Sequence, residues 1–303
     1  MTMSGLTGRL LLVTGATLDG ALPQSIKYRM ASLLARAVFR VWRTGRENAM
    51  ANMSHVLGKP LLHPDTRRVA RKSMENYGWY LADFLSWMRM TPERLEQRVR
   101  EFQGEEYLTE ALKAGKGVIF LSGHFGLWDL GGAILAQRFP VLIPVDQFGS
   151  GTIDWIVRRV RERLGIDMVP VESGLRAMLR QLQANRVVGL LFDRPMGGRG
   201  VPVTFFGSQA YLPAGPAALA LRTGAPLVMC QCRRSEGNGL AVTVYPPIYA
   251  VPSDDEKSDI QATMQQLAGL LEEMIRSCPE QWYMFRPMWA RPLCSEVPGT
   301  GQG

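Results

Sequence analysis

The chain has 303 residues, of which 46% are hydrophobic and 20% are charged. This composition excludes wholesale disorder, and a chain of this length can build a sizeable core without disulfides or a structural metal. Apolar runs of 18 or more residues, which a membrane-spanning helix requires, do not occur. The first residues also lack the basic and then apolar pattern of a signal peptide. We therefore expect any membrane contact to be peripheral.

Positive charge is concentrated in the first third of the chain. Residues 1–100 contain 16 Lys and Arg against 7 Asp and Glu, whereas the remaining residues contain 19 against 20. A basic segment of this kind favours an anionic partner, such as nucleic acid, anionic lipid or a phosphate-bearing substrate. The sequence contains no recognisable nucleic-acid-binding module, so we predict no nucleic-acid partner.

The segment 26–43 predicts a basic amphipathic helix. Its apolar residues recur at the spacing of one helical face, and Trp42 suits a headgroup boundary. Its arginines lie mainly on the other face: Arg29, Arg36, Arg40 and Arg43. Two interpretations remain open: the helix contacts lipid, or it docks on the protein body and its arginines are solvated.

A second helix is predicted to start near Asp65, which can cap it, and to run to about residue 88. It is dense in aromatic residues, and the expectation for such a stripe is core packing, with lipid contact as the alternative. The aromatic residues are Tyr77, Trp79, Tyr80, Phe84 and Trp87.

From about residue 117, short apolar runs alternate with helical stretches. The predicted strands are 118–121, 141–145, 168–171, 187–192, 227–232 and 240–245. The predicted helices are 130–138, 152–164, 174–184, 214–223 and 255–277. This alternation is typical of an α/β fold with a mostly parallel central sheet flanked by helices. We expect an N-terminal segment (1–25), one domain (26–298) whose residues 26–100 form a basic helical cap, and a disordered tail (299–303).

The strongest chemical signal is the stretch GVIFLSGHFGLWDLGG, in which His124 follows the apolar strand 118–121. Ligands bind at the carboxyl ends of strands in parallel α/β sheets. Gly123 and Gly126 allow close approach of the backbone to a substrate. Asp129 lies in the first turn of the next helix, where it could fold back and accept a proton from one imidazole nitrogen. The other nitrogen would then serve as a general base. The alternative is a structural histidine beside a helix N-terminal acid.

Other residues predict little chemistry. Cys230, Cys232, Cys278 and Cys294 lack the partners of a zinc site, so we predict buried or half-buried thiols and no metal. His55 and His63 suit surface or capping positions. Gly197, Gly198 and Gly200 lack the motif of a phosphate-binding loop, and we interpret them as a turn.

The sequence resembles a known family. HFGLWD fits the His-x4-Asp/Glu signature of the lysophospholipid acyltransferase superfamily, and it is most similar to the branch of lipid A late acyltransferases and phosphatidylinositol-mannoside acyltransferases. Further blocks follow in the order of that branch: RENAMANMSHVLG, DWIVRRVRERLG, LLFDRPMGGRGVPVTFFG, LPAGPAALALRTGAPLV and CPEQWYMFRPMW. These matches extend from about residue 46 to residue 292.

The resemblance implies a role for each matched residue. His124 would take the proton of the acceptor hydroxyl, and Asp129 would orient it. Arg161 would bind a phosphate or polarise the acyl carbonyl, and Asp193 and Arg194 would line the substrate site. We also consider Phe205 and Phe206 as an acyl groove, with core packing as the alternative. No covalent intermediate is required, which agrees with the absence of a G-x-S-x-G nucleophile motif.

The expected reaction is transfer of a fatty acyl group from acyl-CoA or acyl carrier protein to a hydroxyl of a lipid or glycolipid, without a cofactor. The expected location is the cytoplasmic face of an anionic membrane. Two departures from the branch affect acceptor specificity: Pro195 replaces a frequent second acid, and Phe285 replaces a frequent histidine. A non-catalytic lipid-binding protein and a thioester or lipid hydrolase on the same fold are the alternatives.

Overall fold

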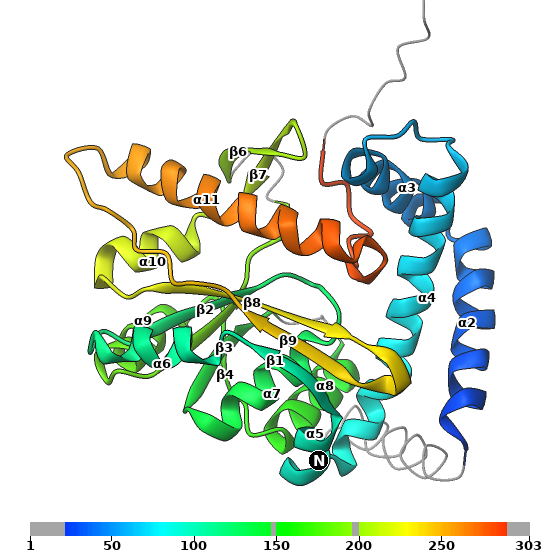
Figure 1. Cartoon of the computed structure of the whole chain (residues 1–303), viewed down its shortest axis with the longest axis horizontal. Helices are drawn as coiled ribbons and strands as arrows, with labels where there is room; N and C mark the ends of the chain where they lie inside the picture. The colour runs from blue at the N-terminus through cyan, green and yellow to red at the C-terminus, as the bar shows by residue number, and fades with distance from the viewer. Residues whose placement is uncertain (1–21, 147–149, 196–199, 290–303) are drawn as a thin grey trace, which may run out of the picture.

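The computed structural model describes residues 22–146, 150–195 and 200–289 (Figure 1). Most of the predicted N-terminal segment, the predicted tail, Gly197, Gly198 and Cys294 lie outside these residues.

A seven-stranded sheet forms the centre of the protein, in the order β1-β9-β8-β2-β5-β3-β4 (Figure 1). Within it, β8 and β9 pair antiparallel, and the other neighbouring strands pair parallel. The strands are β1 (Val99–Gln103), β2 (Val118–Ser122), β3 (Val141–Val145), β4 (Asp167–Pro170), β5 (Val187–Leu191), β8 (Leu227–Arg234) and β9 (Leu240–Val244). The predicted α/β class and mostly parallel sheet are confirmed.

Helices cover both faces of this sheet because its central strands are apolar on both sides. In β2, Ile119 and Leu121 enter one core cluster, and Val118 and Phe120 enter the other. The first cluster lies under α10 (Gly215–Thr223) and α11 (Glu256–Ser277), to which α9 (Leu175–Gln183) adds Leu182. The second lies under α5 (Pro92–Arg98), α6 (Glu105–Lys113), α7 (Trp128–Arg138) and α8 (Gly151–Arg163).

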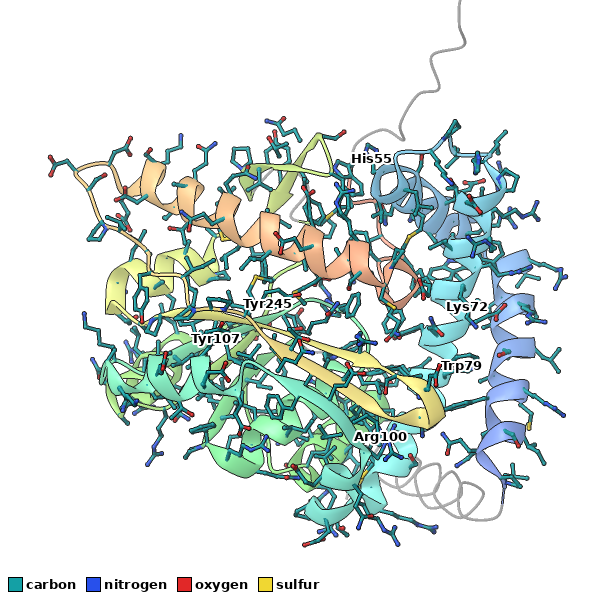
Figure 2. All side chains as sticks on the ribbon, in the orientation of Figure 1. His55, Lys72, Trp79, Arg100, Tyr107 and Tyr245 are labelled. Atoms are coloured by element: carbon teal, nitrogen blue, oxygen red, sulfur yellow. The ribbon has the colours of Figure 1, made fainter. Side chains whose placement is uncertain are left out.

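The N-terminal helices α2 (Gln24–Val41), α3 (Arg43–Leu57) and α4 (Pro64–Ser86) form the predicted helical cap at one side of the body (Figure 1). Helix α2 docks on α4, where Gly78 admits Ala31 and Ala35 closely. Trp79 points from α4 toward α2 (Figure 2), and its indole N–H donates to Ser32 Oγ at 2.8 Å.

The apolar stripe predicted for 26–43 does not make this contact. The buried residues of α2 are Ala35 and Phe39. Most large residues of the stripe are instead exposed, namely Ile26, Met30, Leu33, Leu34 and Val41, whereas Val38 is partly buried against the core. Docking on the body and an exposed apolar face therefore coexist in one helix.

The prediction that residues 26–100 are helical includes α3 and α5 without giving their bounds, whereas α6, strand β1 and a small antiparallel hairpin were missed by the sequence prediction. The hairpin, β6 (Val201–Phe205) and β7 (Ser208–Leu212), turns at Phe206 and Gly207, both with positive φ. In the described residues its two strands pair only with each other and form a sheet separate from the central one. Short 3-10 helices complete the elements: η1 (Trp87–Arg89), η2 (Glu236–Asn238) and η3 (Pro279–Gln281).

Candidate active site

His124 lies at the carboxyl end of β2, two residues after Ser122. Asp193 lies two residues after Leu191, the last residue of β5. The two strands are parallel neighbours with Ser122 opposite Leu191, so both side chains emerge at the same edge of the sheet. A Cβ added at Gly123 would lie 3.0 Å from Asp193 Oδ2, so a glycine leaves room for this carboxylate.

The imidazole of His124 pairs with Asp193. His124 Nδ1 lies 2.7 Å from Asp193 Oδ1, and the backbone N–H of His124 donates to Oδ2 at 2.8 Å. The indole N–H of Trp282 donates to the same Oδ2 at 3.0 Å. The ring of His124 remains 16% exposed, whereas Asp193 is fully buried. A carboxylate on Nδ1 fixes the tautomer in which Nε2 accepts a proton.

Burial by itself raises the pKa of the Asp193 carboxyl. The charge of His124, together with hydrogen bonds from its ring, from Trp282 and from the His124 backbone, outweighs burial and places the pKa below its ordinary value. Asp193 is therefore ionised at neutral pH and can stabilise an imidazolium.

Asp129 contacts Tyr80 and Arg161 rather than the expected imidazole of His124. Asp129 lies in the first turn of α7, from which its carboxylate reaches α4 and α8. Tyr80 donates its hydroxyl to Oδ2, and Arg161 Nε donates to Oδ1 at 2.7 Å. The prediction that Asp129 orients His124 is therefore corrected: Asp193 occupies that position because β5 ends beside β2.

The Tyr80–Asp129–Arg161 group is a buried charge cluster next to the histidine. The Asp129 side chain is 3% exposed and that of Arg161 is 13% exposed. Burial lowers the pKa of the Arg161 guanidinium, but the charge of Asp129 outweighs burial and leaves the pKa raised. Burial raises the pKa of the Tyr80 phenol, and Asp129 raises it further. Arg161 therefore stays cationic and Tyr80 stays neutral beside the site.

Aromatic rings line the space between this cluster and His124. Trp128 lies 5.5 Å from the His124 ring, centroid to centroid, and stacks on Tyr80 at 4.1 Å. Tyr283 lies 5.9 Å from Trp128, and its backbone N–H donates to the His124 carbonyl at 2.9 Å. The Trp128 indole N–H is buried and has no hydrogen-bond partner among the described residues.

The closing segment of the chain, residues 278–289, packs beside the loop that carries the histidine. Gly126, with a φ of +58°, donates its N–H to the Gln281 carbonyl at 2.8 Å. Asn52 of α3 donates to the carbonyls of Met284 and Arg286 at 2.8 Å. Ser73 of α4 donates to the Trp282 carbonyl at 2.6 Å. The N-terminal helices thus hold Trp282, a residue in the recognised closing block to which the sequence assigned no role.

The remaining predicted residues lie at the rim or away from the site. Arg194 is partly exposed and pairs with Asp146 at 3.1 Å, at the same sheet edge as Asp193. Phe205 and Phe206 are buried, 0% and 6% exposed, and pack with Trp289. They belong to the core cluster under α11, so the core-packing alternative holds for both.

The two other histidines have structural contacts. His63 Nδ1 accepts the N–H of Asp65 at 3.2 Å at the start of α4, as a capping residue does. His55 is buried and stacks on Trp289 at 4.2 Å, so it is not at the surface. Within the described residues, no three His, Cys, Asp or Glu side chains are placed to hold a metal ion.

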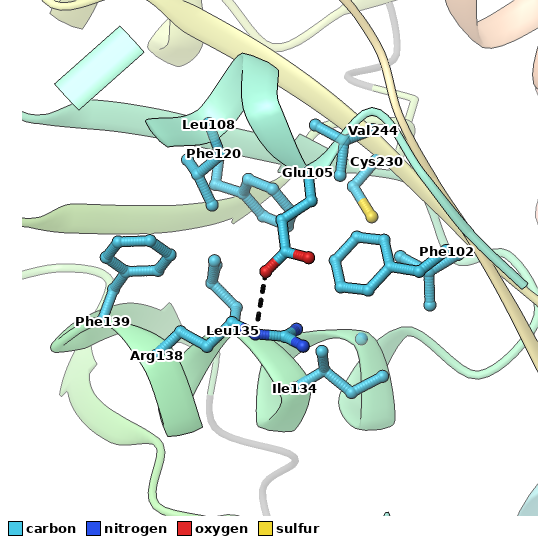
Figure 3. Close-up of a pocket in the computed structure, with 12 residues that line it drawn as sticks. Phe102, Glu105, Leu108, Phe120, Ile134, Leu135, Arg138, Phe139, Cys230 and Val244 are labelled. Atoms are coloured by element: carbon cyan, nitrogen blue, oxygen red, sulfur yellow. Dashed lines mark ion pairs between the residues drawn. The ribbon is translucent and has the colours of Figure 1, made fainter. Parts of the chain in front are cut away.

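A separate apolar cavity lies between α6, α7 and the sheet (Figure 3). The ion pair of Glu105 and Arg138, 3.0 Å apart, crosses it. His124 does not line this cavity. Helix α7 contributes to both sites, because it begins at Trp128 beside His124 and its Ile134 lines the cavity. Its other lining residues include Phe102, Leu108, Phe120, Leu135, Phe139 and Cys230.

Comparisons with known proteins show which family the chain resembles. Residues 4–291 match the family model described as bacterial lipid A biosynthesis acyltransferase. A phosphatidylinositol mannoside acyltransferase of Mycobacterium tuberculosis is 33% identical over 261 residues, 82% of this chain and 78% of that protein. One from Mycolicibacterium smegmatis is 30% identical over 93% of this chain and 91% of its own length. The lipid A biosynthesis lauroyltransferase of Escherichia coli is 25% identical over 89% and 88%.

Proposed function

Because the chain belongs to the bacterial lipid A biosynthesis acyltransferase family, we propose that it moves a fatty acyl group from an acyl thioester to a hydroxyl of a glycolipid acceptor. The chain is an enzyme that transfers acyl groups. The donor in this proposal is acyl-CoA or acyl carrier protein, and no cofactor takes part. The glycolipid acceptor is supported by the phosphatidylinositol mannoside acyltransferases, which are 30–33% identical to the chain.

The observation that carries the mechanism is the pairing of His124 Nδ1 with Asp193 at 2.7 Å. With Nδ1 occupied, Nε2 of His124 removes the proton from the acceptor hydroxyl as its oxygen attacks the thioester carbonyl. The C–S bond then breaks, and the proton on Nε2 passes to the departing thiolate. Asp193 stabilises the imidazolium that exists between these two steps.

Two arginines, Arg161 and Arg194, support stabilisation of the oxyanion in this proposal. Arg161 keeps its charge because Asp129 lies 2.7 Å from its Nε. Arg194 lies at the rim of the same edge, where it can contact an anionic headgroup or the phosphate of the donor. Preorganised donors of this kind favour the charge that develops on the carbonyl oxygen.

A membrane surface is the proposed place of reaction, at its cytoplasmic face, where the thioester donors occur. The exposed stripe of α2 supports this: Leu33 is 66% and Leu34 67% exposed. No helix within the described ranges is long and apolar enough to cross a bilayer. Arg36 pairs with Glu75 and Arg43 with Glu47, both at 2.8 Å. Because two of the four arginines are paired with acids of the protein, the proposal assigns the larger share of the contact to apolar burial.

The test is a transfer assay with purified protein, a long-chain acyl-CoA and phosphatidylinositol mannoside in vesicles. We expect His124→Ala to lower the transfer rate about 10²–10⁴-fold while circular dichroism and the unfolding temperature stay unchanged. A folded variant that retains more than roughly a tenth of the wild-type rate would exclude His124 as the base. Acyl release that is independent of acceptor would indicate a hydrolase, and lipid binding without turnover a non-catalytic protein.

A further inference from the structure

A continuous series of aromatic contacts joins His124 to the surface of the N-terminal helices. From the imidazole, the contacts pass to Trp128 and on to Tyr80, which lies 5.7 Å from Tyr77, centroid to centroid. Tyr77 then lies 5.5 Å from Phe285. Phe285 in turn lies 6.2 Å from Trp42, at the end of α2.

The members of this series differ in their exposure. Tyr80 is buried, at 4%, and so is Tyr283, at 7%, which contacts Tyr77, Tyr80 and Trp128. Trp128, Tyr77 and Phe285 are partly exposed, and Trp42 is 46% exposed. We call the residues Trp128, Tyr77, Phe285 and Trp42 the aromatic wall. Core packing alone does not explain why these four rings keep exposed surface.

Two charged residues of the site act electrostatically on Tyr77, in the inner half of the aromatic wall. Burial raises the pKa of the Tyr77 phenol, while the positive charge of Arg194 acts to lower it and the negative charge of Asp129 to raise it. Tyr77 therefore lies within electrostatic range of both residues. Its phenol is a donor and acceptor at the rim of the site, next to apolar ring faces.

The outer end of the aromatic wall meets the exposed stripe of α2. Trp42 follows Val41, which is 79% exposed. Asn48 of α3 donates to the Phe285 carbonyl at 3.0 Å, which fixes this position between the helices and the closing segment. A lipid whose chains contact α2 therefore has the partly exposed rings of Trp42, Phe285 and Tyr77 beside it, and the buried ring of Tyr80 joins Tyr77 to Trp128 beside His124.

We propose that the aromatic wall positions the glycolipid acceptor, with Phe285 and Tyr77 against its sugar rings and Trp42 beside its acyl chains. This inference rests on the proposed function and deepens it. Aromatic faces bind the apolar faces of sugar rings, and the Tyr77 hydroxyl supplies a hydrogen bond to a sugar hydroxyl. The acceptor hydroxyl then reaches Nε2 of His124 while the lipid chains stay in the bilayer.

The test measures KM separately for donor and acceptor, with phosphatidylinositol mannoside in vesicles and with its deacylated, soluble form. We expect Phe285→Ala and Tyr77→Ala to raise the KM for both acceptor forms about three- to tenfold, with the KM for acyl-CoA near wild type. Trp42→Ala should raise the KM only for the vesicle-borne acceptor. Tyr77→Phe keeps the ring and should lose less than Tyr77→Ala.

Tyr249→Ala is the matched control, since Tyr249 is an aromatic residue 55% exposed outside the aromatic wall. It should leave every KM unchanged. Equal acceptor KM values in wild type, Phe285→Ala and Tyr77→Ala would overturn the inference. The inference would also be overturned if the KM values for donor and acceptor rose together in variants whose unfolding temperature is lowered. Wild-type protein that transfers to neither acceptor form would overturn the proposed glycolipid function, and the aromatic wall with it.

Discussion

His124 Nδ1 and Asp193 Oδ1 lie 2.7 Å apart, although 69 residues separate them in the chain. Asp193 also accepts the backbone N–H of His124, so a single carboxylate holds both the ring and the loop that carries it. The orientation of the imidazole and the position of the loop therefore depend on one side chain.

Asp193→Asn is expected to reduce kcat strongly with little change in KM. An amide keeps the size of the side chain but supplies no negative charge for the imidazolium, so we expect a loss of about 10²–10⁴-fold. Steady-state kinetics with saturating donor measures this. Wild-type kcat in the folded variant would show that the ion pair has no role in turnover.

Asp129→Asn is expected to act mainly on stability. It leaves the Arg161 guanidinium largely buried without its carboxylate, which costs about 3–5 kcal/mol when a buried pair is broken. Urea unfolding measures the change. Tyr80→Phe removes only one hydroxyl from the same carboxylate and should cost about 1 kcal/mol. Unchanged stability, with a loss of activity equal to that of His124→Ala, would instead assign Asp129 to the imidazole.

The unfolding free energy should fall in acid partly because of Asp193. Its pKa in the folded protein lies below its ordinary value of 3.8. Its contribution is therefore fully present above that value and is lost as pH falls through the folded pKa. Trp282→Phe removes one hydrogen bond that lowers this pKa, so the contribution of Asp193 should be smaller and its loss should be complete at a higher pH. Identical acid unfolding curves would contradict the Trp282 contact.

Asp83 is expected to hold α2 on the body. It accepts the Tyr28 hydroxyl at 2.8 Å and pairs with Arg234 at 2.9 Å, and its side chain is 4% exposed. Asp83→Asn should therefore accelerate proteolysis between α2 and α3, because the neutral amide no longer balances Arg234. Asp65→Asn, which removes a more exposed acid, is the control. Equal digestion rates would show that α2 docks without this cluster.

Vesicle binding should depend on the apolar stripe of α2. Replacing Leu33 and Leu34 with Glu removes exposed apolar surface and should weaken co-sedimentation with anionic vesicles strongly. Arg29→Glu with Arg40→Glu should weaken it less, by about 1 kcal/mol for each charge near the surface, and only at low salt. Binding that is indifferent to both pairs would exclude α2 as the contact.

Apart from the hairpin of β6 and β7, the order of strands and helices after residue 117 could be predicted from the sequence, because each strand of the central sheet in this region is a short apolar run between helical periods. The position of His124 could be predicted for the same reason, since it follows such a run directly. The amphipathic pattern of 26–43 likewise predicted a helix, because it repeats at the helical period.

The tertiary structure decided which acid meets the histidine and which way α2 faces. Sequence distance favoured Asp129, five residues from His124, but the pairing of β2 with β5 brings Asp193 to Nδ1, and no local pattern encodes strand order. The apolar stripe of α2 resembles that of a docked helix. The structure turns it outward because Ala35 and Phe39, with Gly78 of α4, make the closer contact.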